Sequence, residues 1–294
     1  MPLEPAVLVH SNCELGEGPV WDSERCRLWW VDITEGRLHY WDLADWMTES
    51  WQFEHPLSAV LLTETPVVVL ALGPRIVTFD PSSGISLRLA ELEGISASCR
   101  WNDAKVDPQG RAWLGLMEMR EERQVGAGAL YLMDRFRGLE CQLDGLTIPN
   151  GADWAPDSRT MYFVDSPTRM ISARAFSPDT GQLGEPKRLV DLAGYAGVPD
   201  GLTVAADGSI WVAFWGGSAV RGFDVDGQLL AEVVLPVSQV TSCCFGGANY
   251  SRMFITTGRY GLSEAQLASQ PLAGSVFHVA MDSYRGRPAN RYCL

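Results

Sequence analysis

Short hydrophobic runs, each bounded by Gly, Pro, Asp or Ser, recur along the whole chain. The clearest lie at residues 27–33, 67–72, 76–79, 161–165, 210–214 and 253–257. They are rich in β-branched and aromatic residues, a composition typical of strands. Helical periodicity is almost absent, and only residues 263–270 could form one or two helical turns. The pattern predicts an all-β protein.

A longer repeat groups these strands into units. Each unit reads as a strand, a turn containing Asp, Pro, Gly or Ser, a second strand, a loop and a third strand. Four units begin clearly and two fit more loosely: Gly18, Asn102, Asn150 and Asp200, and then Leu57 and Ser242. A period of about 40–50 residues is typical of propeller blades. We therefore expect residues 1–294 to form a single six-bladed β-propeller domain with about four antiparallel strands per blade.

Charge and cysteine content limit the partners and the cell compartment that we expect for the protein. The net charge is −13, which disfavours nucleic acid and anionic membrane surfaces as partners and favours cations. The N-terminus does not resemble a secretory signal, and no apolar run is long enough to span a membrane. The seven cysteines include no CxxC pair, so we expect reduced thiols and a cytoplasmic location.

Nucleophilic catalysis has little support in the sequence. There is no G-x-S-x-G motif. The four histidines lie outside the repeated motifs and have no informative partner at a catalytic spacing. Glycine-rich phosphate or dinucleotide loops are also absent. These observations disfavour Ser-His and Cys-His catalysts and nucleotide-dependent enzymes.

Polar residues instead recur at one position of the repeat, just before the first strand of a unit. They are Glu17, Asn102, Asn150 and Asp200. Any one of them, next to Gly or Pro, would be an ordinary turn residue. Because the innermost strands of a propeller surround one channel, Glu17, Asn150 and Asp200 should converge at its mouth. Two carboxylates and an amide oxygen would suit Ca²⁺, Mg²⁺ or Mn²⁺, and could accept Fe²⁺ or Zn²⁺.

At these residues the sequence resembles the SMP-30/gluconolactonase/regucalcin-like family. The matching motifs are LGEGPVWD at 15–22, RWNDAKVDPQGRAWLG at 100–115, IPNGADW at 148–154 and VPDGLTV at 198–204, with GALYLMD at 128–134. The resemblance implies a six-bladed propeller holding one divalent cation. The ligand positions of the family fall on Glu17, Asn150 and Asp200.

The resemblance also implies residues that contact the substrate. They fall on Arg100 and Asn102. Some members carry a further substrate-binding Glu after this motif. The stretch MEMREE leaves Glu118 and Glu121 as candidates for that role and leaves the preferred sugar open.

These parts predict an enzyme that hydrolyses a sugar lactone, a small-molecule substrate. A metal would polarise the lactone carbonyl, and Asp200 would act as the general base toward water. Two alternatives stay open. One is another metal-dependent esterase, lactonase or phosphotriesterase activity on the same scaffold, and the other is a non-catalytic metal-binding regulatory propeller. The sequence indicates neither the native metal nor the oligomeric state.

Overall fold

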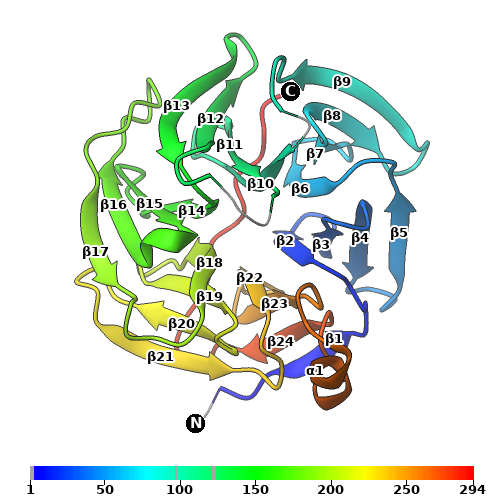
Figure 1. Ribbon diagram of the computed structural model, residues 1–294. Coiled ribbons are helices and arrows are strands. Elements are labelled where there is room, and N and C mark those ends of the chain that lie inside the picture. The colour runs from blue at the N-terminus through cyan, green and yellow to red at the C-terminus, as the bar shows by residue number, and fades with distance from the viewer. Residues whose placement is uncertain (1–2, 97, 121–123) are drawn as a thin grey trace.

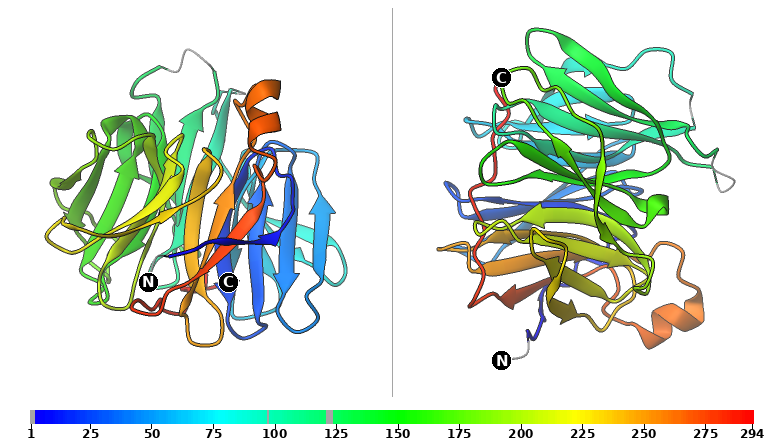
Figure 2. Two further views of the ribbon diagram at one scale, coloured as in Figure 1. Left: turned by 90° about the horizontal axis from the view of Figure 1, so that it is seen from below. Right: turned by 90° about the vertical axis from the view of Figure 1, so that its left-hand side faces the viewer.

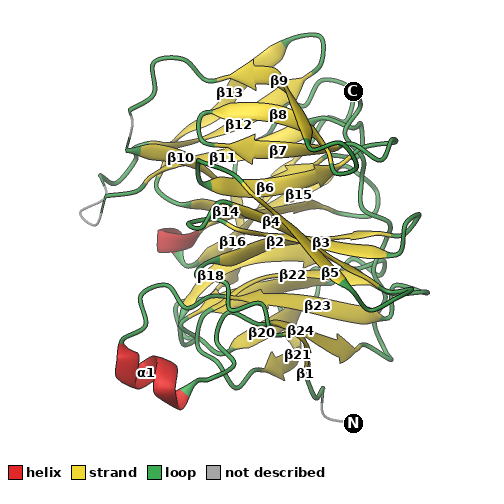
Figure 3. Ribbon diagram, turned by 90° about the vertical axis from the view of Figure 1, so that its right-hand side faces the viewer, coloured by secondary structure: helices red, strands yellow, loops and turns green. Residues whose placement is uncertain are grey.

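The computed structural model describes residues 3–96, 98–120 and 124–294. Within these residues, strands form six antiparallel sheets of four strands each, arranged as a ring around a central axis, whose path through the ring we call the channel (Figure 1). The predicted six-bladed β-propeller is therefore confirmed. Strands dominate the described residues (Figure 3), and the helices there are α1 (Glu264–Ser269) and the 3₁₀ turn η1 (Ser166–Thr168).

We number the blades along the chain and give the strands of each from the channel outward. Blade 1 is β2 (Gly16–Asp22), β3 (Arg27–Asp32), β4 (Arg37–Asp42) and β5 (Thr48–Gln52). Blade 2 is β6 (Leu57–Leu62), β7 (Val68–Leu72), β8 (Arg75–Asp80) and β9 (Ile85–Glu91). Blade 3 is β10 (Cys99–Val106), β11 (Ala112–Glu118), β12 (Gly128–Asp134) and β13 (Gly138–Leu146).

Blade 4 is β14 (Pro149–Trp154), β15 (Thr160–Asp165), β16 (Met170–Ala175) and β17 (Lys187–Asp191). Blade 5 is β18 (Val198–Val204), β19 (Ile210–Trp215), β20 (Ala219–Phe223) and β21 (Leu229–Val234). Blade 6 is β22 (Val240–Gly246), β23 (Arg252–Thr257), β24 (Val276–Ala280) and β1 (Ala6–Val9).

Burial follows the order of the strands within a blade. Every residue of β6 is buried, whereas β9 at the outer edge of the same blade is largely exposed. The blades pack face to face through apolar side chains; Trp29 and Val31 of blade 1, for example, belong to one buried cluster with Leu70 of blade 2. This packing explains why the sequence shows short hydrophobic strands on both sides of each turn.

The N-terminal strand closes the ring. β1 pairs with β24, so blade 6 combines the first and last strands of the chain. The sequence motifs did not predict this, because the paired residues Ala6 and His278 are almost the whole chain apart. A sheet shared by the two ends of the chain ties the first blade to the last.

The C-terminal segment, residues 281–294, crosses the face of the ring opposite α1 (Figure 2). Its backbone hydrogen-bonds to several blades: Tyr292 N donates to Leu62 O at 2.7 Å, and Cys293 N donates to Gly110 O at 2.9 Å. Across the described residues, no helix is long and apolar enough to cross a membrane. All seven cysteines are free thiols, as the sequence predicted.

Candidate functional site

The polar residues that share a repeat position lie inside the innermost strands, close to their starts, and not before them as the sequence suggested. Glu17 belongs to β2, Asn102 to β10, Asn150 to β14 and Asp200 to β18. The pairing register of each strand shifts at this point. Such a bulge takes a side chain out of the regular alternation and can redirect it, so these residues interrupt their strands without ending them.

Two further blades carry polar residues at the same bulge, and the sequence reasoning missed them. They are Ser58 in β6 and Thr241 in β22. Both side chains are fully buried. Ser and Thr are common strand residues, so only the register shift distinguishes them. All six innermost strands therefore place a polar side chain at the same level of the channel.

Glycines after two of the bulge residues allow neighbouring blades to approach closely. A Cβ at Gly151 would lie 2.8 Å from Asp200 O of blade 5, and one at Gly201 would overlap the Ser242 side chain of blade 6. These glycines are thus needed for contact between blades. They bring the strands that carry Asn150 and Asp200 side by side.

Carboxylates from the second strands hold the loops that enter the site. Asp32 accepts hydrogen bonds from the backbone N–H groups of Glu14 and Leu15, at 2.8 and 3.0 Å. Asp165, at the same place in blade 4, accepts from Ile148 N at 2.7 Å. These contacts fix the backbone just before Glu17 and Asn150.

The carboxyl groups of Glu17 and Asp200 lie in one buried cluster with Asp103. Burial raises the pKa of Glu17 to about 8, and the charge of Asp103 acts in the same direction, against a hydrogen bond from Gly18 N and the charge of Arg100. Burial also raises the pKa of Asp200 well above its usual value, reinforced by Glu17 and Asp103. The structure therefore brings Glu17, Asp200 and Asn150 together, since Asn150 hydrogen-bonds to Asp200 and opposes that rise.

A cavity of about 80 Å³ with a mixed polar and apolar lining lies in the channel beside this cluster, and Glu17, Asn150 and Asp200 are not among its lining residues. Gly18, Asp103, Lys105 and Asp153 line it, and Arg287 of the C-terminal segment lines it as well. Burial raises the pKa of Asp103, while the charge of Lys105 lowers it. Asp103 Oδ1 also accepts a hydrogen bond from Ala104 N at 2.7 Å.

Arg100 and Asn102 connect the cluster to the rim of the channel. Arg100 Nη1 donates to Asn102 Oδ1 at 2.7 Å and to Trp101 O at 2.8 Å. Asn102 Nδ2 in turn donates to Asn150 Oδ1 at 3.2 Å. The predicted substrate residues therefore adjoin the predicted metal ligands.

Glu118, one of the two candidates for a further substrate contact, makes local structural contacts. Its carboxylate pairs with Arg120 Nε at 2.9 Å and accepts from Gln124 N at 3.0 Å. It also lies directly across from Cys99, at the start of β10. Glu118 thus holds Arg120 and Gln124 close to the end of β11. Glu121, the other candidate, lies outside the described residues.

The model of the family described as "SMP-30/Gluconolactonase/LRE-like region" matches residues 15–259. The chain belongs to this family. It is 34% identical to regucalcin of Gallus gallus over 281 residues, 93% of each chain. It is 33% identical to regucalcin of Homo sapiens over 272 residues, 91% of each. The resemblance seen in the sequence motifs is confirmed.

Solved structures of family members superpose over nearly the whole chain. A calcium-binding protein, regucalcin, from Agrobacterium tumefaciens gives a TM-score of 0.94 at 29% identity, covering 100% of this chain and 99% of that one. A gluconolactonase from Xanthomonas campestris gives 0.74 at 23% identity, covering 95% and 89%. At that identity the second likeness shows the fold alone.

Proposed function

We propose that this family member is a metal-dependent lactonase that hydrolyses a sugar (aldono-) lactone to the corresponding sugar acid. The observation that carries the proposal is the cluster formed by Glu17, Asn150 and Asp200 at the channel mouth. Membership of the family described as "SMP-30/Gluconolactonase/LRE-like region" supports a lactonase-type activity. Arg100 and Asn102, two polar side chains beside the cluster, favour a substrate with several hydroxyl groups.

The chemistry of the cluster fits one divalent cation. Two carboxyl groups buried together are unfavourable unless a positive charge compensates them. Carboxylate and amide oxygens are suitable ligands for Ca²⁺, Mg²⁺ or Mn²⁺, and could accept Fe²⁺ or Zn²⁺. Asn150 Oδ1 keeps a second lone pair beside its hydrogen bond from Asn102. Among the described residues, no group of three or more His, Cys, Asp or Glu could hold a metal ion, so the proposed set depends on this amide oxygen.

The bound cation would supply Lewis-acid polarisation of the lactone carbonyl. Asp200 would act as the general base, because one carboxylate oxygen can take a proton from the attacking water. The water oxygen forms a bond to the carbonyl carbon, and the ring C–O ester bond breaks. The ring oxygen leaves as a hydroxyl group after receiving a proton, which gives the open-chain acid.

Residues at the rim would orient the sugar. The guanidinium of Arg100 presents several N–H donors in a fixed plane and can hold hydroxyl groups or a carboxylate. The Asn102 side chain, already held by Arg100, would contact neighbouring hydroxyls. Glu118, at the end of β11, and Glu121, outside the described residues, are the proposed further contacts.

A lactone panel on metal-stripped protein tests the proposal. Ca²⁺, Mg²⁺, Mn²⁺, Fe²⁺ or Zn²⁺ is added back singly, and acid release is followed with a pH indicator. We expect hydrolysis that depends on the added ion. Asp200→Ala should lower kcat/KM at least ~10²-fold, from loss of the base alone. Asp191→Asn, which changes an exposed carboxylate paired with Arg188, is the matched control and should leave activity unchanged.

The same panel separates the alternatives. Turnover of aryl esters or phosphotriesters without turnover of sugar lactones would favour another esterase on this scaffold. Metal binding without hydrolysis of any substrate would favour a regulatory, non-catalytic propeller. The name regucalcin, borne by several relatives, makes this second outcome the more important one to exclude.

A further inference from the structure

Three of the six bulge side chains hydrogen-bond to the next blade in the same manner. Ser58 Oγ donates to Trp101 O at 2.5 Å, Asn102 Nδ2 donates to Pro149 O at 3.0 Å, and Thr241 Oγ1 donates to Gly16 O at 2.5 Å. In each case the acceptor is the carbonyl just before the bulge residue of the following blade. The three bonds thus repeat one geometric rule around the channel.

The other three bulge residues do not follow this rule. Among the hydrogen bonds of the described residues, none runs from Glu17, Asn150 or Asp200 to the carbonyl before the next bulge. Carboxylates cannot donate when ionised, and Asn150 Nδ2 donates instead to Ser166 Oγ of its own blade at 3.0 Å. The six bulge residues therefore form two groups: three that donate a hydrogen bond to the next blade, and the three proposed metal ligands.

Each braced peptide directly precedes a residue of the proposed site. Thr241 holds the carbonyl before Glu17, and Ser58 holds the carbonyl before Asn102. The hydroxyls are deeply buried, with exposed fractions of 0% for Thr241 and 2% for Ser58. Thr241 Oγ1 also lies 2.8 Å from Thr256 Oγ1, itself fully buried. Water cannot readily replace these contacts.

We propose that Thr241 and Ser58 are positioning residues of the site. Thr241 fixes the peptide that carries Glu17 and so acts on metal affinity. Ser58 fixes the peptide that carries Asn102 and so acts on substrate binding. Residues that orient metal ligands commonly change affinity strongly without touching the ion. This inference rests on the proposed function, because it assigns each hydroxyl to one half of that site.

Thr241→Val tests the first assignment, because it keeps the side-chain shape and removes the hydroxyl. Metal binding is measured by calorimetric titration of chelator-stripped protein with Ca²⁺ and with Mn²⁺. We expect Kd to rise about 10- to 100-fold. Thr241→Ser, which keeps the hydroxyl, should restore the affinity.

Thr257→Val is the matched control. Thr257 is also fully buried in blade 6 and pairs with Val240 beside the bulge, but its Oγ1 donates to Ser275 O at 2.6 Å and not to the peptide before Glu17. The control should lower the melting temperature as Thr241→Val does but leave Kd unchanged. Equal effects of the two variants on Kd would reduce Thr241 to a general stabilising role and overturn the assignment.

Ser58→Ala tests the second assignment and keeps the inference falsifiable if Thr241→Val does not fold. We expect kcat/KM for the lactone to fall by up to about 100-fold, mainly through KM, because misplacement of a substrate contact has this effect. The metal Kd should change far less than in Thr241→Val, because Asn102 would act on the ion only through its hydrogen bond to Asn150 Oδ1. An unchanged KM would overturn the role of Ser58.

Failure of the proposed function and failure of the positioning roles give different results in these titrations. Wild-type protein that binds none of the ions in the titration would remove the metal centre, and the inference with it. Wild-type protein that binds metal, with the same Kd in Thr241→Val, would leave the proposed function standing and overturn only the positioning role.

Discussion

The two ends of strand β2 carry buried carboxyl groups in opposite surroundings. At the mouth, burial and Asp103 raise the pKa of Glu17 to about 8. At the far end, burial alone would raise the pKa of Asp22, but hydrogen bonds and charges of Arg25 and Arg291 outweigh it and hold the pKa below its usual value. Four residues of one strand lie between a carboxyl group that Arg100 compensates only in part and one that two arginines pair.

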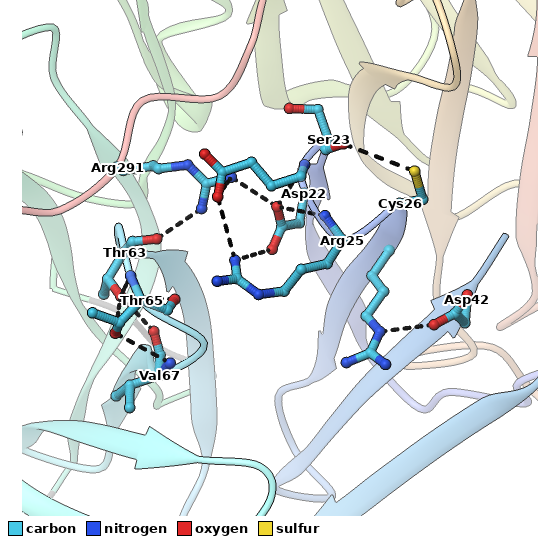
Figure 4. A network of polar contacts seen from close by, with 11 residues as sticks. Asp22, Ser23, Arg25, Cys26, Asp42, Thr63, Thr65, Val67 and Arg291 are labelled. Carbon is cyan, nitrogen blue, oxygen red and sulfur yellow. Dashed lines mark hydrogen bonds and ion pairs between the residues drawn. The ribbon is translucent and has the colours of Figure 1, made fainter. Parts of the chain in front are cut away.

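The far end is paired by residues distant in the sequence. Arg291, from the C-terminal segment, places Nη2 2.7 Å from Asp22 Oδ1, and Arg25 Nη1 lies 2.9 Å from Asp22 Oδ2 (Figure 4). Arg291 Nη1 also donates to Thr63 O of blade 2 at 2.7 Å. This end therefore stabilises the ring, whereas at the mouth the raised pKa values of Glu17 and Asp200 show too little positive charge, which a bound cation can supply.

Blade 3 likewise carries a buried carboxyl group, Asp107, at the far end of its innermost strand. A substitution there should cause the largest loss of stability. Asp107 follows β10 and is fully buried. It accepts from Arg111 Nε at 2.7 Å and from Trp113 Nε1 at 3.1 Å. Arg111→Met should lower the free energy of unfolding by about 3–5 kcal/mol, because it leaves a buried carboxylate without its cation.

Urea denaturation measures this effect. The double variant Asp107→Asn with Arg111→Met removes both charges and should recover part of the loss. A loss below about 1 kcal/mol in Arg111→Met, the range of exposed pairs, would contradict the view that the far end is held by compensated buried charge.

Removal of the Arg291–Asp22 pair should cause the next largest loss of stability. Arg291→Met should lower the free energy of unfolding at neutral pH by about 1.5–3 kcal/mol, the range for hydrogen bonds to charged groups. Because the folded pKa of Asp22 is lowered, its stabilisation is present above the unfolded value of about 3.9 and is lost as pH falls through the folded value. The difference between wild type and variant should therefore shrink in acid.

Denaturation curves at pH 7 and pH 3 measure that change. Arg291→Lys, which keeps the charge but loses the planar fork, should recover only part of the stability. A difference that stays constant from pH 7 to pH 3 would show that Arg291 acts through packing and not through Asp22.

The sequence predicted the features of the fold and of the mouth that recur in successive blades. The period of the strands predicted the blades, and the Glu, Asn and Asp before Gly predicted which side chains meet at the mouth. Ser58 and Thr241 were missed because a hydroxyl in a strand is unremarkable unless the register shift is known. Arg291 was missed because nothing local marks a pair whose members are 269 residues apart.

The mouth should show the opposite pH dependence in metal-free protein. The folded pKa of Glu17, about 8, is above the ordinary value of 4.5. As pH rises through this interval the unfolded state loses its proton first, so the folded state becomes less favourable. Metal-free Glu17→Gln should therefore be more stable than metal-free wild type at pH 8, by at least about 1.4 kcal/mol, the value of one pKa unit.

Denaturation in the presence of a chelator measures the Glu17 effect at pH 8 and near pH 4.5. The advantage of Glu17→Gln should disappear at the lower pH, where Glu17 is protonated in both states. An excess of the divalent ion should reverse the order at pH 8, because binding stabilises only the protein that keeps its ligand. A variant that is less stable than wild type without metal would contradict the view that the mouth lacks positive charge to pair with Glu17.

The smallest effect should come from an ion pair at the outer edge of a blade. Arg88 Nη1 and Glu91 Oε2 of β9 are 2.6 Å apart, no longer than the pairs of the far end, but their side chains are 66% and 36% exposed. Arg88→Gln should change the free energy of unfolding by no more than about 0.5 kcal/mol, because solvent screens the charges and two mobile side chains must be ordered. The measurement is urea denaturation beside Arg291→Met, with both variants repeated at high salt. If distance governed these interactions, the two variants would lose similar stability. A small loss of stability in Arg88→Gln and a large loss in Arg291→Met would instead show that burial sets the strength of these ion pairs. Burial also distinguishes the carboxyl groups at the two ends of β2 from those at the outer edge of a blade.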